Sequence, residues 1–201
     1  MSYSSTSSTE SLRVAVEFVE GSGSDVWADL TVDRDGGGPL DLSAAPRTVV
    51  RVRAADLREA RKMRDRARAD ASAEGRDPDT LTVLVDLEVI VDLEARVARR
   101  RAQDAWRRAG GGAAGLSYVG TPTGLAGLIA DIHAVKVADG VTLIPVAGGV
   151  TVDNIVDGTL PWLESRGLIE IAPSSVELGR RFAAGRGRAT GRSDGRAALA
   201  S

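Results

Sequence analysis

The most informative feature of this sequence is an apolar run, TVLVDLEVIV at residues 82–91, that stands between two helical patterns. Residues 56–74 before it and residues 92–109 after it carry apolar side chains at helical spacing. Strand patterns at 117–120 and 140–146 are likewise each followed by a helical pattern. Strands that alternate with helices of this length indicate parallel βαβ units. The sequence therefore predicts an α/β fold.

Several helix ends are marked by capping residues. Asp56 can accept from the first free amides of the helix at 56–74, and Glu59 follows three residues later, as in a capping box. Thr121 can cap the helix that begins at Pro122. Proline is favourable at this first position, because the amide proton that it lacks would have no partner there. A last helix is predicted over 152–166. Shorter strand patterns are found nearer the amino terminus, at 13–19, 26–32 and 48–53.

The chain length limits how large this α/β fold can be. A complete eightfold (β/α) barrel needs about 250 residues, whereas this chain has 201. We therefore expect a partial (β/α) barrel, incomplete relative to a TIM barrel, with about four to five parallel strands. The chain has no cysteine, which excludes disulfides, thiolate metal sites and a cysteine nucleophile. We expect no bound metal.

The two ends of the chain differ in composition from the middle. Residues 1–11 are almost all serine and threonine, which indicates a disordered leader and no secretory signal. Residues 171–201 are rich in arginine and glycine, which is typical of a disordered, solvated tail or, as an alternative, of a contact with single-stranded RNA. The ordered domain is therefore expected to span residues 12–170. We expect the protein to be cytoplasmic.

The overall charge and hydropathy argue against two kinds of partner. The formal net charge is −2, which gives no general attraction to nucleic acid or to anionic lipid. The longest apolar runs are shorter than the 18–20 residues, roughly, that a membrane span requires. Nucleic acid and membrane are therefore not expected as partners.

Asp86 and Glu88 are the closest pair of carboxylates within an apolar strand pattern. Their spacing of two places both on one face of the strand, opposite Val85, Leu87 and Val89. On a barrel strand such a pair is a candidate for catalysis when it faces inward near the carboxyl end. The alternative, which we favour from the residues alone, is that one or both lie at a solvated strand end or pair with arginines.

Three other features are candidates for binding. Gly21, Ser22, Gly23 and Ser24 follow a strand directly and can cradle a phosphate with their amides, although a plain turn is the simpler interpretation. A GxGxxG pattern at 110–115 follows a helix and not a strand, so it is interpreted as a connector. His133 has no partner at metal-ligand spacing and is interpreted as a partly buried, hydrogen-bonded side chain.

The second half of the chain also carries motifs of a known family. These are YVGTP at 118–122, ADGVTLIP at 138–145 and NIVDGTLPWLESRGL at 154–168, with AEGRDPDTL at 73–81 as a weaker match. They resemble the closing segment of bacterial luciferase-like, flavin-dependent monooxygenases, with the nitrilotriacetate and alkanesulfonate monooxygenases as the most similar group. The resemblance spans roughly 12–169 and corresponds to the carboxy-terminal half of that family's barrel.

The resemblance implies a bacterial flavin-dependent oxidoreductase that uses reduced FMN and O₂ on a small organic substrate. It implies the loop at Gly21–Ser24 as the counterpart of the family's phosphate loop, and it transfers no catalytic residue. Half a barrel leaves an open edge, so we expect a homodimer or a complex with a full-length relative that completes the site. The alternative is a non-catalytic scaffold or regulatory partner that keeps the half-barrel without flavin.

Overall fold

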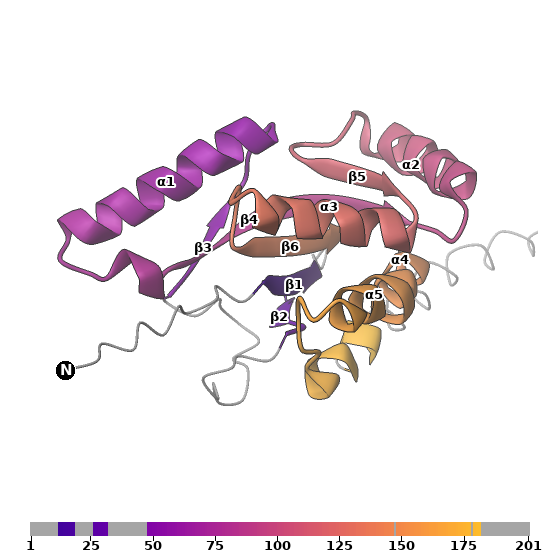
Figure 1. Ribbon diagram of the computed structural model, residues 1–201. Helices are drawn as coiled ribbons and strands as arrows, with labels where there is room; N and C mark the ends of the chain where they lie inside the picture. The colour runs from indigo at the N-terminus through magenta and orange to yellow at the C-terminus, as the bar shows by residue number, and fades with distance from the viewer. Residues whose placement is uncertain (1–11, 19–25, 32–47, 147, 178, 182–201) are drawn as a thin grey trace, which may run out of the picture.

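The computed structural model describes residues 12–18, 26–31, 48–146, 148–177 and 179–181. Figure 1 shows strands and helices arranged around one sheet. The elements, in chain order, are β1 (Arg13–Phe18), β2 (Val26–Asp29), β3 (Val49–Val52), α1 (Leu57–Ala73), the 3₁₀ turn η1 (Pro78–Thr80), β4 (Thr82–Val91), α2 (Ala95–Ala109), β5 (Ser117–Gly120), α3 (Pro122–Ala134), β6 (Gly140–Pro145), α4 (Gly149–Asn154), the π-helical segment η2 (Ile155–Thr159) and α5 (Leu160–Ser165).

The sheet has six strands in the order β2-β1-β6-β4-β3, with β5 paired to β4 outside this path. β4 is long enough to pair with two short strands on one edge, with β3 through Thr82–Val85 and with β5 through Glu88–Val91. Its other edge pairs with β6, and β6 pairs in turn with β1. All of these pairings are parallel, and only β2 runs antiparallel, against β1. The predicted partial barrel with about five parallel strands is thus confirmed.

The two faces of the sheet are covered differently. On β4, Val83, Val85, Leu87, Val89 and Val91 are all buried in the main core, which also contains residues of α1, α3, α4 and α5. We call this the outer face; in Figure 1, α3 lies in front of β4 and β6. The alternate residues of β4 point to the opposite, inner face, where α2 packs on the carboxyl end of the strand through a small cluster around Ile90.

The predicted helix caps are present. The Asp56 carboxylate accepts from the amide of Glu59 at 2.8 Å, and the Glu59 carboxylate accepts from the amide of Ala55 at 2.7 Å. Thr121 accepts from the amide of Gly124 at 3.3 Å, with Pro122 as the first residue of α3. These contacts satisfy amides that have no partner within the helix, so local sequence alone fixes where α1 and α3 begin.

The last helical stretch differs from its prediction. It begins at Gly149, three residues before the predicted start at Val152, and contains the π-helical segment η2. Gly148 precedes it with φ +79°, a conformation that glycine adopts without a steric cost. Two side chains of α4 hold the end of β4: the Thr151 hydroxyl accepts from the amide of Val91 at 3.4 Å, and the Asn154 side chain donates to the Val91 carbonyl at 3.1 Å.

The predicted leader at 1–11 and residues 182–201 of the predicted tail lie outside the described residues. The chain continues in regular structure after residue 170, with a bridge between Thr31 and Ile171 and helical residues at 173–177 and 179–181. Arg180 forms an ion pair with Asp157 of η2. The domain boundary at 170 stays a prediction.

Substitution of Gly140 is expected to strain the sheet. A Cβ atom there would lie 2.0 Å from the carbonyl oxygen of Arg13, on the neighbouring strand β1, and the backbone cannot rotate away from it. We expect Gly140→Ala to lower the free energy of unfolding by about 1–3 kcal/mol, as overpacking does. Urea denaturation measures this change.

Gly127 is the matched control for that substitution. It lies inside α3, and a Cβ atom there would meet nothing within 4 Å. Gly127→Ala should stabilise the protein by about 0.5–1 kcal/mol, because glycine is unfavourable inside a helix. Equal effects of the two substitutions would contradict the close approach of β1 to β6.

Candidate functional site

The candidate site lies on the inner face of the sheet, where Asp86 and Glu88 of β4 are found. Both residues alternate with the side chains that enter the outer core, so the sequence placed them correctly on one face. Asp86 is buried, with 8% of its surface exposed, and Glu88 is half-buried. The structure gives the two carboxylates different partners.

Arg51 of β3 connects Asp86 to a third carboxylate, Glu17 of β1. Its Nε and Nη2 atoms donate to the two Asp86 oxygens at 3.0 Å each. Its Nη1 and Nη2 atoms donate to the two Glu17 oxygens at 2.5 and 2.8 Å. Because β6 and β4 lie between β1 and β3, the Arg51 side chain crosses two strands on the inner face. This cluster, Glu17–Arg51–Asp86, joins strands that are not neighbours in the sheet.

The electrostatics of the cluster keep Arg51 charged. The hydrogen bonds that the guanidinium donates to Glu17 raise its pKa most, burial opposes this increase, and Asp86 raises the pKa further. A second arginine, Arg53, lies 3.7 Å from Asp86 with its side chain mostly exposed. Asp86 is thus held by arginines, as the favoured alternative expected. Its part in catalysis stays a prediction.

Glu88 is the carboxylate of the pair that faces a small hollow. Its Oε1 atom accepts from the amide of Ala114 at 3.3 Å, and the described residues give it no arginine partner. The hollow is lined by Arg53, Asp86, Glu88, Gly115, Leu116 and Ile144 and has a volume of about 170 Å³, open solvent included. Sites for small organic ligands measure about 300–1,000 Å³. This hollow is therefore only a fraction of such a site.

The other inner-face contacts had no specific indication in the sequence. The indole of Trp27 donates to the Thr142 hydroxyl at 3.3 Å, and Trp27 packs with Ala15 and Leu84 beside the ion cluster. Arg51 and Thr142 are each a single polar residue within an apolar strand, and Glu17 lies between apolar neighbours in β1. That isolated polarity was a signal that these side chains face a polar interior, but it did not identify their partners.

The other sequence candidates contribute little to this site. The proposed phosphate loop, Gly21–Ser24, lies outside the described residues. Gly110 ends α2 in the left-handed conformation, with φ +74°, so the GxGxxG pattern does follow a helix. His133 is half-buried in the last turn of α3. No group of metal-binding side chains occurs among the described residues, and none of the described helices is long and apolar enough to cross a membrane.

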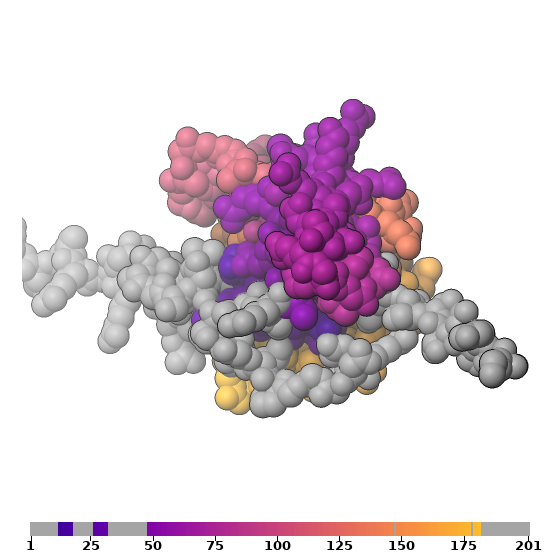
Figure 2. Space-filling view, turned by 90° about the vertical axis from the view of Figure 1, so that its left-hand side faces the viewer, coloured from indigo at the N-terminus to yellow at the C-terminus, as the bar shows by residue number. Residues whose placement is uncertain are grey.

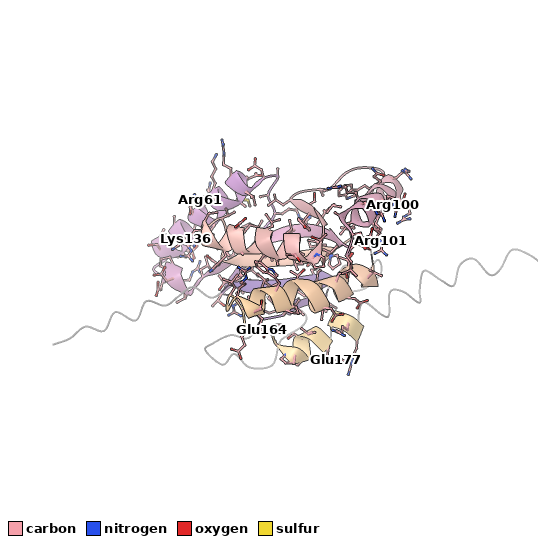
Figure 3. The ribbon with its side chains drawn as sticks, turned by 45° about the vertical axis from the view of Figure 1, so that its right-hand side comes forward. Arg61, Arg100, Arg101, Lys136, Glu164 and Glu177 are labelled. Atoms are coloured by element: carbon pink, nitrogen blue, oxygen red, sulfur yellow. The ribbon has the colours of Figure 1, made fainter. Side chains whose placement is uncertain are left out.

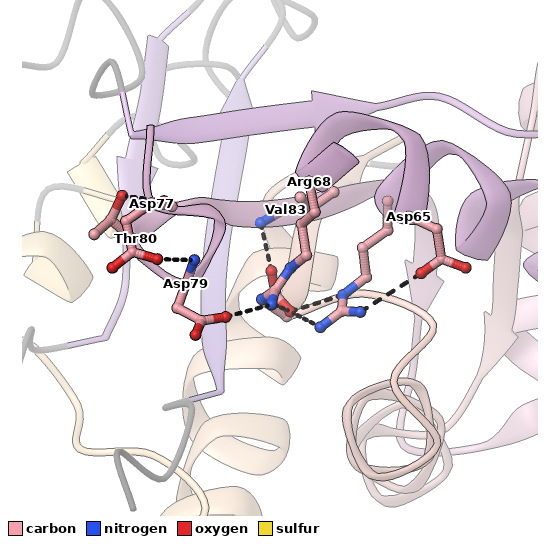
Figure 4. Close-up of polar contacts among 8 residues, drawn as sticks. Asp65, Arg68, Asp77, Asp79, Thr80 and Val83 are labelled. Carbon is pink, nitrogen blue, oxygen red and sulfur yellow. Dashed lines mark hydrogen bonds and ion pairs between the residues drawn. The ribbon is translucent and has the colours of Figure 1, made fainter. Parts of the chain in front are cut away.

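A second buried ion cluster lies at the opposite, amino-terminal end of the strands (Figure 4). Asp139 precedes β6, and its Oδ1 accepts from Arg64 at 2.9 Å and from Arg68 at 3.2 Å. Its Oδ2 accepts from the amide of Val83, at the start of β4, at 2.7 Å. Sites in (β/α) barrels lie at the carboxyl ends of the strands, whereas polar residues at the amino ends serve stability. We therefore assign this cluster to stability.

This cluster shows that not all arginines of α1 are solvated. Arg64 is 6% exposed and Arg68 is half-buried. In Figure 2, α1 forms the surface nearest the viewer. The helix thus has two kinds of basic residue. Those on the side that faces the sheet bind Asp139 and attach the helix to the sheet.

No protein-family model matches the chain, and no curated protein sequence matches it significantly. Solved structures do resemble it. The long-chain alkane monooxygenase LadA shares 20% identity and a TM-score of 0.52 over 62% of this chain and 38% of its own. The riboflavin lyase RcaE, solved with modified FMN and riboflavin, shares 16% identity and a TM-score of 0.52 over 62% and 40%. The EDTA monooxygenase EmoA from Chelativorans sp. BNC1 shares 15% identity and a TM-score of 0.51 over 66% and 46%.

These similarities concern the fold. The identities are too low to transfer residue roles, and the chain spans less than half the length of each of these proteins. The described sheet and its helices are therefore similar to one part of a larger α/β enzyme fold.

Proposed function

We propose that this protein is a flavin-dependent oxidoreductase of the luciferase-like type that uses reduced FMN and O₂ on a small organic substrate. The observation that carries the proposal is the shared half-barrel: LadA and EmoA are monooxygenases, and RcaE was solved with a modified FMN. The motifs at 118–122, 138–145 and 154–168 support the same family from the sequence.

The hollow beside Glu88 does not by itself fit a flavin. It is too small for the ring system. The inner face also carries Glu17 and Asp86, and their carboxylates would repel a phosphate. Both carboxylates already bind Arg51. We therefore propose that a further chain completes the site, and no reaction step is assigned to the residues described here.

One observation favours a second function, that of a non-catalytic scaffold or regulatory partner. The Arg51 guanidinium donates to both oxygens of Asp86 and to both oxygens of Glu17, so these two buried carboxylates of the inner face are occupied by protein groups. A binding protein that retained the half-barrel would need such internal pairing and no open cofactor pocket.

Titration with FMN distinguishes these two functions. For the enzyme we expect flavin fluorescence to be quenched on binding and the protein to be stabilised by about 2.7 kcal/mol when FMN exceeds its Kd by a factor of about 100. Isothermal binding and thermal unfolding should both be measured. No quenching and no stabilisation would support the scaffold function and contradict the enzymatic one.

The proposed phosphate loop has a control of its own. Ser24→Glu places a negative charge in that loop. It should weaken the binding of FMN, which carries a phosphate, and leave the binding of riboflavin unchanged. A loss of both ligands would show that residues 21–24 do not act as a phosphate loop.

A further inference from the structure

The formal net charge of −2 is an average over the chain, and it hides one strongly basic helix. α2 carries six arginines and a single acidic residue, Asp104, which gives it a net charge of +5 over 15 residues. α1 also carries six basic residues, but Glu59, Asp65 and Asp70 are interleaved with them. Among the described helices, α2 is therefore the one that most strongly attracts an anion.

The arginines of α2 are concentrated on the side that faces away from the sheet. Three buried alanines and the half-buried Trp106 form its apolar side, which packs on β4 and β5. Helical spacing places positions 96, 100 and 107 in one row on the opposite side, with position 99 beside them. All four positions are exposed. We call Arg96, Arg99, Arg100 and Arg107 the α2 basic face.

The four arginines of the α2 basic face are available to a partner. Arg99 and Arg100 have no ion-pair partner among the described residues. Arg96 and Arg107 pair with acidic side chains two and three residues away, but they are themselves 78% and 74% exposed. Exposed pairs of this kind contribute at most about 1 kcal/mol. A phosphate can therefore replace the carboxylate in either pair at little cost.

The composition of the face indicates the kind of partner. None of the large apolar side chains that are exposed in the described chain belongs to α2. The centre of a protein interface is depleted in charge and rich in apolar and aromatic groups. A helix that binds a membrane surface inserts its apolar side, and the apolar side of α2 is packed on the sheet. A nucleic-acid backbone requires neither, because its protein interfaces are polar and strongly basic.

We propose that the α2 basic face binds the phosphate backbone of double-stranded DNA without sequence preference. From Arg96 to Arg107 the face is about 16 Å long, at 1.5 Å per residue. B-DNA carries about nine phosphate charges over that length. Single strands are bound largely by stacking on aromatic rings, whereas Trp106 packs beside Ile90 and Val119. A duplex is therefore the occupant that fits an all-arginine face.

The connection that follows α2 leaves room for such a backbone. Residues 110–112 are exposed glycines, and a Cβ atom at any of them would meet nothing within 4 Å. No side chain of this segment holds a backbone away from Arg107. The α2 basic face shares no residue with the hollow beside Glu88. Its binding is therefore tested without flavin.

Fluorescence anisotropy of the full chain with a labelled duplex of about 20 base pairs is the first test. We expect a Kd on the order of 10⁻⁴–10⁻⁶ M at physiological salt. The logarithm of the binding constant should fall with the logarithm of the salt concentration with a slope of about −3.6, because each neutralised phosphate contributes about −0.9. Arg99→Gln with Arg100→Gln should halve this slope and raise the Kd at least about tenfold at low salt.

Arg61→Gln with Lys62→Gln is the matched control. Both residues are exposed on α1 and have no ion-pair partner among the described residues. In Figure 3, Arg61 and Arg100 lie at opposite ends of the molecule. The control changes the net charge by the same amount, so it should bind the duplex as the wild type does. Circular dichroism of both variants confirms that they are folded.

Four results would overturn the proposal. The first is a wild-type chain that does not bind the duplex at low salt, and the second is an equal loss of binding in the two variants. The third is binding that Arg99→Gln with Arg100→Gln leaves unchanged, which would place the contact elsewhere, for example in the arginine-rich residues 171–201. The fourth is tighter binding to a single strand, or to vesicles that contain phosphatidylserine, than to the duplex.

Discussion

Replacing Asp139 with alanine is expected to lower the free energy of unfolding by about 3–5 kcal/mol, because the substitution leaves buried arginine charge without its partner. Asp139 is 5% exposed and Arg64 is 6% exposed. The same carboxylate accepts from the amide of Val83, so this amide also loses its bond. Urea denaturation followed by circular dichroism measures the change.

The control for this substitution is Asp79→Ala. Asp79 pairs with Arg68, which also contacts Asp139, but its side chain is 85% exposed. An exposed ion pair contributes at most about 1 kcal/mol. If Asp139→Ala were no more destabilising than Asp79→Ala, the assignment of the amino-terminal ion cluster to stability would be wrong.

Replacing Arg51 with methionine is expected to lower the free energy of unfolding by about 3 kcal/mol. Methionine is about as long as the aliphatic stem of arginine and lacks the guanidinium. The buried carboxylates of Glu17 and Asp86 therefore lose the cation that balances their charge. Arg53→Met is the matched control, since its side chain is 63% exposed and its contact with Asp86 is 3.7 Å. That control should cost less than about 1 kcal/mol.

A triple variant separates a lost ion pair from a lost packing contact. With Glu17→Gln and Asp86→Asn added to Arg51→Met, no charge of the cluster remains, and most of the lost stability should return. Failure of the triple variant to recover stability would show that the guanidinium matters through its hydrogen bonds and packing and not through the balance of charge.

The local structure of this chain could be predicted from its sequence because local interactions determine it. The strand at 82–91 has the predicted bounds, and the capping contacts of Asp56 and Thr121 are those that their residue types indicate. The alternation along β4 also placed Asp86 and Glu88 on one face. In each case the decisive partners lie within a few residues of one another.

The arrangement of the sheet and of the site could not be predicted in this way. Glu17 and Arg51 are 34 residues apart in the chain, and their contact depends on β6 being inserted between β1 and β4. The same holds for Arg64 and Asp139, which are 75 residues apart. Charged residues on a helix look alike in sequence whether they are solvated or buried, because their burial is decided by the element against which the helix packs.

The position of β1 in the sheet has a consequence for synthesis on the ribosome. Arg13 of β1 pairs with Gly140 of β6, so β1 is separated from this neighbour by 127 residues (140 − 13). At about 5–20 residues per second, its partner follows after roughly 6–25 s. During that interval β1 can pair only with β2, and the other edge of this hairpin stays open to any strand it meets. The nascent chain is therefore most exposed to misassociation, and most in need of chaperones, before residue 140 has left the exit tunnel.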